Sequence, residues 1–500
     1  MIERIRFESL KDKVTTAEEA VKLIKDGMVV GSSGFTKAGD SKVVLPALAD
    51  RAREEQIKIT LMTGASLGHG TDGLLAEAGA LKKRMPFQVD RVLRNKINKG
   101  EVLFIDQHLS ESAELLHTKN LPEVDVAIIE VAYIDRDGSI VPTTSVGNSV
   151  TFAALAKTVI LEINTSVPED VYGIHDIYQA EDYPHRNVIP IVAPWNKIGR
   201  RTIPLNPDKV KAIVFTDKQD SPADIAPPDE KTEKIASHIL HFFEEEVRQG
   251  HLSDRLLPIQ SGIGKVSNAV LTGFINSNFY DLTMFSEVLQ DSAFDLMDAG
   301  KLSFASASSV TVSESCYDRV FRNLSKYRDK FVLRPQNISN TPGLIRRLGI
   351  IAINTAIEFD IYGNVNSTHV GGTAIMNGIG GSGDFARNAY LSIFVTQAAS
   401  KDNKISHIVP MVSHTDHTEH DVDILVTDQG LADLRGLAPR ERAQTIIENC
   451  VHPDYKDQLQ DYFDRACERG GHTPHVLEES LSWHSRFALH GTMNKNDVAQ

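Results

Sequence analysis

Glu287 lies just beyond a short, mostly apolar segment, Leu282–Phe285, and is flanked by Phe285 and Val288. The segment is typical of a strand, and ligands of open α/β sheets gather outside the carboxyl ends of strands. A carboxylate there is partly desolvated, which makes it a better nucleophile than a carboxylate in water. The alternative is a glutamate that begins a helix, where the helix dipole favours an acidic side chain.

A glycine-rich run, Gly378–Gly383, matches the pattern G-x-G-x-x-G. A dinucleotide site with this spacing also needs a strand directly before it and a helix directly after it. Residues 371–377 are too rich in glycine for a clean strand, which disfavours a nicotinamide or flavin site. The run instead provides a backbone that can approach a ligand closely and point N–H groups at an anion or a developing oxyanion. A flexible turn is the alternative.

Ser66 lies at the centre of Gly64-Ala65-Ser66-Leu67-Gly68, which fits the G-x-S-x-G nucleophile elbow of serine hydrolases. The segment follows a predicted strand that ends near Met62, as an elbow should. The pattern is short, and the chain has 18 histidines. The presence of a histidine that could act as the catalytic base of Ser66 is therefore weak evidence for a serine hydrolase. A turn of small residues at a strand end is therefore the favoured interpretation, and a serine hydrolase is the competing one.

His414, His417 and His420 stand three residues apart, a spacing that would bring them together on a helix and could hold a metal ion. They follow a predicted strand over Ile408–Val412, in which Pro410 suggests an edge or a bulge. We therefore expect these histidines in a loop, solvated or hydrogen-bonded, and predict no metal site.

Short apolar strands alternate with helical patterns along the chain, which is typical of α/β architecture. A helix is predicted over Asp40–Arg53, with Pro46 in its first turn or at a kink. Residues 216–230 are polar and proline-rich, and form the best linker candidate. Landmarks on either side of this linker recur in the same order: Gly31–Gly34 corresponds to Ser261–Gly264, and Asp135–Ile140 corresponds to Asp360–Val365. This order predicts a duplicated α/β domain with an active site between the halves.

The 500 residues carry a net charge of −14, from 53 basic and 67 acidic side chains. This charge disfavours binding to nucleic acid or to an anionic membrane. The three cysteines cannot build a disulfide framework, and the first 13 residues lack the apolar core of a signal peptide. No apolar run approaches the roughly 18–20 residues of a membrane span. We therefore expect a soluble, cytoplasmic protein.

Several segments together resemble one family, the class I CoA-transferases of the acetyl-CoA hydrolase/transferase family, over essentially the whole chain. Thr143–Ser149 carries the resemblance in the first half. Gly430–Gly436 extends it near the end of the chain. The other matching segments are, in order, Gln260–Gly264, Phe285–Val288, Ser339–Pro342, Tyr362–Thr368 and Gly380–Phe385.

The resemblance implies two related CoA-transferase domains of the NagB/RpiA-like open α/β type in tandem, at residues 1–220 and 221–500, with the catalytic glutamate in the second. It implies that CoA moves from succinyl-CoA to acetate by a ping-pong reaction through Glu287, by way of an acyl-glutamyl anhydride and a glutamyl-CoA thioester. Coenzyme A and acyl-CoA are then substrates, and no prosthetic group is expected. Succinate and acetate are the expected small carboxylates, and a homodimer is the expected assembly.

The resemblance also assigns roles to particular positions. The backbone amides of Ile263 and Gly381 and the side chain of Asn340 match the family's oxyanion donors. The residues that match CoA contacts are Gln260, Ser261, Gly262, Ile263, Gly264, Asn377, Gly381 and Lys401.

One position departs from the family pattern: Asp428 stands where the family usually has glutamate. Its side chain is one methylene shorter, so we expect the change to affect acyl preference more than the class of reaction. Two alternatives to transfer remain open. Hydrolysis of acyl-CoA would use the same glutamate with water as the final acceptor, and a silent CoA-binding protein would have no need of Glu287.

Overall fold

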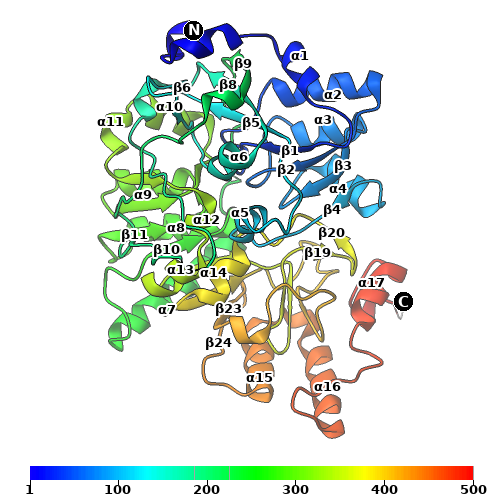
Figure 1. Ribbon diagram of the computed structural model, residues 1–500. Coiled ribbons are helices and arrows are strands. Elements are labelled where there is room, and N and C mark those ends of the chain that lie inside the picture. The colour runs from blue at the N-terminus through cyan, green and yellow to red at the C-terminus, as the bar shows by residue number, and fades with distance from the viewer. Residues whose placement is uncertain (185, 224–225, 499–500) are drawn as a thin grey trace. The chain divides into compact units, whose positions relative to one another are not determined.

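Helices and strands alternate along the computed structural model, which describes residues 1–184, 186–223 and 226–498 (Figure 1). The chain divides into two units. Unit 1 contains Met1–Asp224, Thr283–Asp298 and Leu302–Leu348, and unit 2 contains Ile225–Leu282, Ala299–Lys301 and Gly349–Gln500. The predicted linker at 216–230 includes the first change of unit, and its residues 224 and 225 lie outside the described residues.

A seven-stranded sheet forms the amino-terminal part of unit 1, in the order β4-β3-β2-β1-β5-β8-β9. All neighbouring strands are parallel. The chain order reverses between β1 and β5, so the switch point of this α/β sheet lies there. The strands are β1 (Val29–Ser32), β2 (Ile59–Met62), β3 (Leu81–Met85), β4 (Leu103–Phe104), β5 (Val126–Val131), β8 (Thr158–Asn164) and β9 (Val210–Thr216).

The strands of this sheet are buried because helices cover it. All six residues of β5 are buried, as is usual for a central parallel strand. A cluster of apolar side chains joins β1 and β2 to the helices α2, α3 and α4, which lie beside these strands (Figure 1). The helices of this part are α1 (Ala17–Ala20), α2 (Val44–Glu55), α3 (Thr71–Glu77), α4 (Arg91–Asn98), α5 (Glu111–His117) and α6 (Ser149–Leu155).

Helix α2 begins at Val44, and the predicted start at Asp40 was wrong. The carboxylate of Glu162 accepts hydrogen bonds from the backbone amides of Lys42, Val43 and Val44, at 2.5, 3.1 and 3.2 Å. A buried carboxylate from another strand therefore satisfies the amides at the start of the helix. Pro46 lies in the first turn, where proline needs no intrahelical acceptor.

The remaining strands of unit 1 include three neighbours in the order β15-β13-β11. Strand β13 pairs in parallel with β15, and β12 pairs in parallel with β14. The elements are β11 (Leu282–Phe285), β12 (Val288–Leu289), α9 (Asp291–Asp298), β13 (Leu302–Ala307), β14 (Ser309–Val310), α10 (Glu314–Phe321), α11 (Leu324–Tyr327), β15 (Phe331–Leu333), α12 (Gln336–Ser339) and α13 (Pro342–Leu348).

Unit 2 contains the strands β10, β16, β21 and β23 as successive parallel neighbours, with β24 antiparallel beside β23. Helix α7 begins with a capping box in which the Asp229 side chain accepts from the Thr232 amide. The elements are α7 (Glu230–Arg248), β10 (Ile259–Ser261), α8 (Lys265–Gly273), β16 (Ile351–Thr355), α14 (Ser382–Asn388), β21 (Leu391–Val395), β22 (Ile408–Val409), β23 (Ile424–Val426) and β24 (Leu431–Asp433).

The carboxy-terminal part of unit 2 adds four helices, of which α15, α16 and α17 contribute to the core cluster of this unit. They are α15 (Pro439–Cys450), α16 (Pro453–Arg469), α17 (Ser482–His490) and α18 (Lys495–Val498). Across the described residues, every helix is too short or too polar to span a membrane.

The predicted duplication corresponds to matching elements. In unit 1, β5 leads into an antiparallel hairpin of β6 (Tyr133–Ile134) and β7 (Ile140–Val141). In unit 2, β16 leads into an antiparallel hairpin of β17 (Glu358–Asp360) and β18 (Val365–Asn366). The hairpin glycines Gly138 and Gly363 both have positive φ, 81° and 93°. The predicted fold class, tandem α/β domains with parallel sheets, is confirmed.

Candidate active site

Glu287 lies between β11 and β12, at the carboxyl end of β11. Its backbone carbonyl accepts hydrogen bonds from the amides of Ser308 and Ser309, at 2.8 and 3.1 Å, which fixes this bend in the chain. The residue is 8% exposed. Helix α9 begins only at Asp291, so Glu287 is not a helix-starting residue. It is a buried carboxylate at a strand end, where desolvation increases its reactivity as a nucleophile.

Asn340 is fully buried and follows helix α12. Its side-chain Nδ2 donates to Glu287 Oε1 at 3.5 Å, a long hydrogen bond. Among the described residues, its Oδ1 has no hydrogen-bond partner. Gln336 anchors α12, since its Nε2 donates to the Leu109 carbonyl at 3.0 Å and its backbone amide donates to the Gly147 carbonyl at 3.0 Å. The structure thus brings together two of the predicted site residues, Glu287 and Asn340.

The loop Gln260–Gly264 connects β10 to α8 in unit 2. Gln260 and Asn354 exchange side-chain hydrogen bonds of 3.1 Å in both directions, which ties β10 to β16. Gly264 has φ +138°, and a Cβ built there would meet nothing within 4 Å. Ile263 is 51% exposed, although it is apolar. This end of the loop therefore leaves open space beside its backbone.

The glycine-rich run lies between a short antiparallel hairpin and helix α14. The hairpin pairs β19 (His369–Val370) with β20 (Ala374–Ile375). No parallel strand directly precedes the run, so its order of elements differs from a dinucleotide fingerprint. Gly380 has φ +58°, and Gly381 begins α14 as its N-cap. In the described part of the chain, the buried Gly381 amide is found with no hydrogen-bond acceptor.

The loops of unit 2 share one edge of its sheet. Helix α14 leads directly into β21. In this kind of α/β connection the start of the helix, here Gly381 with Asn377 before it, belongs to the side of the strands' carboxyl ends, where residues 262–264 also follow β10. Lys401 lies in an exposed turn after β21. Asp428 follows β23, and its carboxylate accepts from the Ala398 amide at 2.7 Å and from Gln429 Nε2 at 2.8 Å.

The competing sequence motifs receive structural roles. Ser66 is 1% exposed, and no hydrogen bond joins its side chain to a histidine in the part of the chain that the structure describes. His414 and His417 lie in a loop, as predicted, although strand β22 ends already at Val409. His420 lies instead in a short 3-10 helix, Glu419–Asp421. Within the described ranges, no group of three or more His, Cys, Asp or Glu side chains is placed to hold a metal ion.

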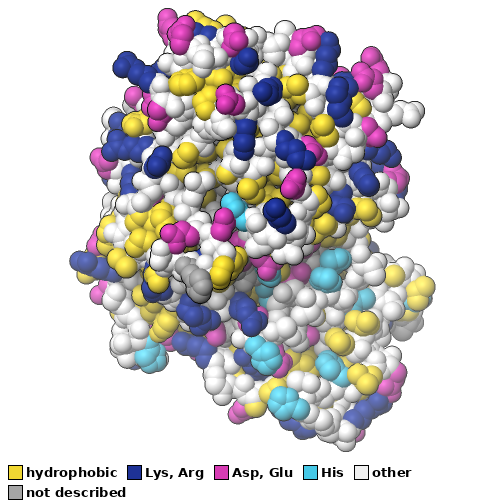
Figure 2. Space-filling view, viewed as in Figure 1, with side chains coloured by type: hydrophobic (Ala, Val, Ile, Leu, Met, Phe, Trp, Pro, Cys, Tyr) yellow, Lys and Arg dark blue, Asp and Glu magenta, His cyan; other side chains and the backbone are white. Residues whose placement is uncertain are grey.

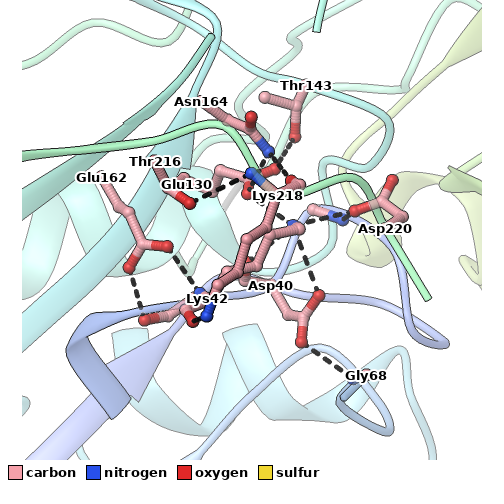
Figure 3. Close-up of polar contacts among 12 residues, drawn as sticks. Asp40, Lys42, Gly68, Glu130, Thr143, Glu162, Asn164, Thr216, Lys218 and Asp220 are labelled. Atoms are coloured by element: carbon pink, nitrogen blue, oxygen red, sulfur yellow. Dashed lines mark hydrogen bonds and ion pairs between the residues drawn. The ribbon is translucent and has the colours of Figure 1, made fainter. Parts of the chain in front are cut away.

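A buried charge cluster near the carboxyl ends of β1 and β5 was missed by the sequence reasoning (Figure 3). Lys42 Nζ contacts Glu130 Oε2 at 2.5 Å, Asp220 Oδ1 at 2.9 Å and Asp40 Oδ1 at 3.6 Å. Thr143 Oγ1 donates to the other oxygen of Glu130 at 2.7 Å. An acid inside an apolar strand was the available signal, because Glu130 interrupts the run of β5.

Burial controls the protonation of this cluster. It raises the pKa of Glu130 to about 8; Lys42 opposes this shift, and the carboxylate of Asp220 adds to it. Burial also raises the pKa of Asp40. Three carboxylates share one lysine, so the folded cluster favours holding a proton on an acid.

Basic and acidic side chains are mixed on the surface. On the face seen in Figure 2, lysine and arginine side chains are interspersed with aspartate and glutamate. This face is therefore not uniformly acidic, although the net charge of the chain is −14. Binding of an anionic substrate depends on N–H groups and cations close to it.

Comparisons with known proteins agree with these features. The family model for the acetyl-CoA hydrolase/transferase N-terminal domain matches residues 3–215, and the model for the C-terminal domain of the same family matches residues 316–463. Succinyl-CoA:acetate CoA-transferase of Clostridium kluyveri is 49% identical over 98% of this chain and 92% of its own length. Acetyl-CoA hydrolase of Candida glabrata is 44% identical over 98% of this chain and 97% of its own length.

The fold also has a solved counterpart. RipA from Yersinia pestis superposes with a TM-score of 0.73, covering 92% of this chain and 99% of its own, at 22% sequence identity. This identity supports the fold alone. The two domain matches and the relatives above 40% identity show more: the chain is an enzyme and belongs to the acetyl-CoA hydrolase/transferase family.

Proposed function

We propose that this enzyme transfers CoA from succinyl-CoA to acetate, giving acetyl-CoA and succinate, with Glu287 as the nucleophile. The observation that supports this most is the buried Glu287 carboxylate with the Asn340 side-chain amide at its Oε1. The name of the Clostridium kluyveri relative supports the choice of acids.

The first half-reaction has two steps. A Glu287 carboxylate oxygen attacks the succinyl thioester carbonyl and the C–S bond breaks. CoA departs as the thiolate, and a mixed anhydride of succinate and Glu287 is formed. The thiolate then attacks the Glu287 side-chain carbonyl, and the anhydride C–O bond breaks. Succinate is released, and a glutamyl-CoA thioester is formed. Acetate reverses these steps and restores the Glu287 carboxylate. An activated acyl bond is kept at every stage, first on succinate, then on Glu287 and finally on acetate, so no ATP and no prosthetic group is required.

Each attack develops negative charge on a carbonyl oxygen, and preorganised N–H donors stabilise that charge. We assign this role to the Asn340 side chain and to the backbone amides of Ile263 and Gly381. CoA contacts are assigned to the loop Gln260–Gly264, Asn377, Gly381 and Lys401. The exposed ammonium of Lys401 suits the phosphates or carbonyl groups of CoA.

Hydrolysis of acyl-CoA is the second candidate, because the Candida glabrata relative is an acetyl-CoA hydrolase. Water would then replace acetate as the final acceptor of the same intermediates. The two functions differ in how well the site excludes water. The low exposure of Glu287 favours transfer.

A paired incubation distinguishes these functions. The enzyme receives succinyl-CoA with and without acetate, and acetyl-CoA and free CoA are measured separately. Transfer predicts acetyl-CoA only with acetate and little free CoA without it. Equal release of free CoA in both samples contradicts transfer and supports hydrolysis. Glu287→Ala should abolish either activity, whereas Glu54→Ala, an exposed glutamate on α2, should leave it unchanged.

We also propose a homodimer, from the family resemblance, and a cytoplasmic location, from the low cysteine content of the chain. Light scattering on the purified chain tests the dimer directly, because it reports the molar mass in solution.

A further inference from the structure

We propose that His417 is a positioning residue that holds the turn Ile379–Ser382, and with it the Gly381 backbone amide, in the orientation needed to donate to an oxyanion. This inference rests on the proposed function, which assigns that amide to the transition state. It assigns a role to a histidine that the sequence had suggested only as part of a possible metal cluster.

Packing and backbone bonds fix the His417 ring. The residue is 3% exposed. Its backbone amide donates to the Val365 carbonyl at 3.1 Å, and its carbonyl accepts from the Val365 amide at 2.8 Å. The imidazole lies against the Phe394 ring, with centroids 4.7 Å apart and planes inclined by 36°. The backbone of His417 and the orientation of its imidazole ring are therefore both fixed.

The Nε2 atom of His417 faces two serine hydroxyls, Ser382 Oγ at 3.1 Å and Ser367 Oγ at 3.4 Å. Both hydroxyl hydrogens have acceptors elsewhere. Ser382 Oγ donates to the Ile379 carbonyl at 2.7 Å, and Ser367 Oγ donates to Asp416 Oδ2 at 3.3 Å. Each serine oxygen can then only accept from His417, so Nε2 carries the proton and donates.

Ser382 closes the turn that contains Gly381. Its amide donates to the Ile379 carbonyl at 3.3 Å and its hydroxyl donates to the same oxygen. Gly380, inside the turn, has φ +58°, a conformation that glycine adopts without strain. The direction of the Gly381 amide depends on this closure. The N–H of His417 keeps the Ser382 side chain in the rotamer that bonds to the Ile379 carbonyl.

The anchor extends beyond the histidine. The Asp416 carboxylate accepts from the Ser367 amide at 2.7 Å and from Thr368 Oγ1 at 2.9 Å. Its side chain is 4% exposed, and its bond to the Ser367 amide holds this second serine that faces His417. The turn is thus connected through His417 to strand β18 and to a buried acid, which gives it a rigid support.

Two substitutions separate donation from packing. His417→Gln places an amide N–H near the position of Nε2, whereas His417→Phe keeps a ring against Phe394 and removes the donor. We expect His417→Phe to lower kcat by about 10- to 100-fold with the KM for acyl-CoA within about threefold, because the lost interaction is made only in the transition state. We expect His417→Gln to stay within about threefold of the wild-type kcat.

Ser382→Ala provides a second path to the same conclusion if His417→Phe does not fold. It should lower kcat like His417→Phe, and the double variant should be no worse than either single variant. The inference is overturned if both His417→Phe and Ser382→Ala keep wild-type kcat, or if His417→Gln loses as much kcat as His417→Phe at an equal melting temperature. Failure of the proposed function looks different: the wild-type enzyme then shows no Glu287-dependent transfer at all.

Discussion

The side-chain amide of Asn340 donates to Oε1 of Glu287 at 3.5 Å, and both residues are buried. Glu287 lies between β11 and β12 and Asn340 follows helix α12, both in unit 1, and each is held by backbone hydrogen bonds of its own. This arrangement places a neutral N–H donor beside a desolvated carboxylate. A donor at that oxygen can strengthen its interaction as charge develops during attack at the glutamyl carbonyl.

Asn340→Ala should lower kcat by about 100- to 1,000-fold, with a small effect on the KM for succinyl-CoA, since an oxyanion donor acts in the transition state. Asn337→Ala is the matched control, because Asn337 lies on the same short helix α12 and is given no role in the reaction. Steady-state kinetics of both variants check this expectation. Equal kcat values for Asn340→Ala and wild type would remove Asn340 from the mechanism.

The buried charge cluster should make stability depend on pH through Glu130. Its pKa is 4.5 in the unfolded chain and about 8 in the folded one. Below pH 4.5 both states hold the proton; between pH 4.5 and 8 the unfolded state has lost it and the folded state retains it. Stability from this group is therefore present below pH 4.5 and is lost as the pH rises through 8.

Glu130→Gln removes this titration. Between pH 5 and 9 the wild type should lose a free energy of unfolding on the order of a few kcal/mol that the variant does not lose. Urea unfolding at several pH values measures the difference. Parallel curves for the two proteins would show that Glu130 does not bind the proton.

Lys42 contacts all three acids of this cluster, so its loss should cost more stability than the loss of a surface lysine. Lys42→Met leaves Glu130, Asp220 and Asp40 uncompensated and should destabilise the protein by about 3–5 kcal/mol. Lys58→Met, at an exposed position, should change stability by less than about 0.5 kcal/mol. Urea midpoints that shift equally for both variants would contradict the role of Lys42.

Much of the fold follows from local sequence. The segment Leu282–Phe285 was predicted as a strand and forms β11, because burial in a sheet requires apolar side chains there. The position of Glu287 at a strand end followed from the same pattern. The repeated hairpins with Gly138 and Gly363 were visible as matching sequence landmarks.

Other features depend on residues that are distant in sequence. The start of α2 is set by Glu162, which lies 118 residues after Val44. The contact of Lys42 with Glu130 and the contact of His417 with Ser382 likewise form only after folding. Periodicity reports which side chains are apolar, but it does not report which polar side chains meet. The roles of Lys42 and His417 were therefore absent from the sequence reading.

Asp428 should influence which acids are accepted. Its carboxylate is held by the Ala398 amide and Gln429, and the family usually has the longer glutamate there. Asp428→Glu should change the ratio of kcat/KM between acetate and propionate by about 10-fold, since one methylene is worth about 1–3 kcal/mol in a pocket. Asp402→Glu, in an exposed turn, should leave the ratio unchanged. An unchanged ratio for both variants would exclude Asp428 from acyl selection.

The covalent role of Glu287 is the central claim, and chemical trapping tests it most directly. The enzyme is incubated with succinyl-CoA without acetate, reduced with borohydride, digested and analysed by mass spectrometry. The account predicts that the peptide containing Glu287 carries a primary alcohol in place of the carboxylate, since borohydride reduces the glutamyl-CoA thioester. An unmodified Glu287 in an enzyme that transfers CoA, or reduction at another acid, would contradict it.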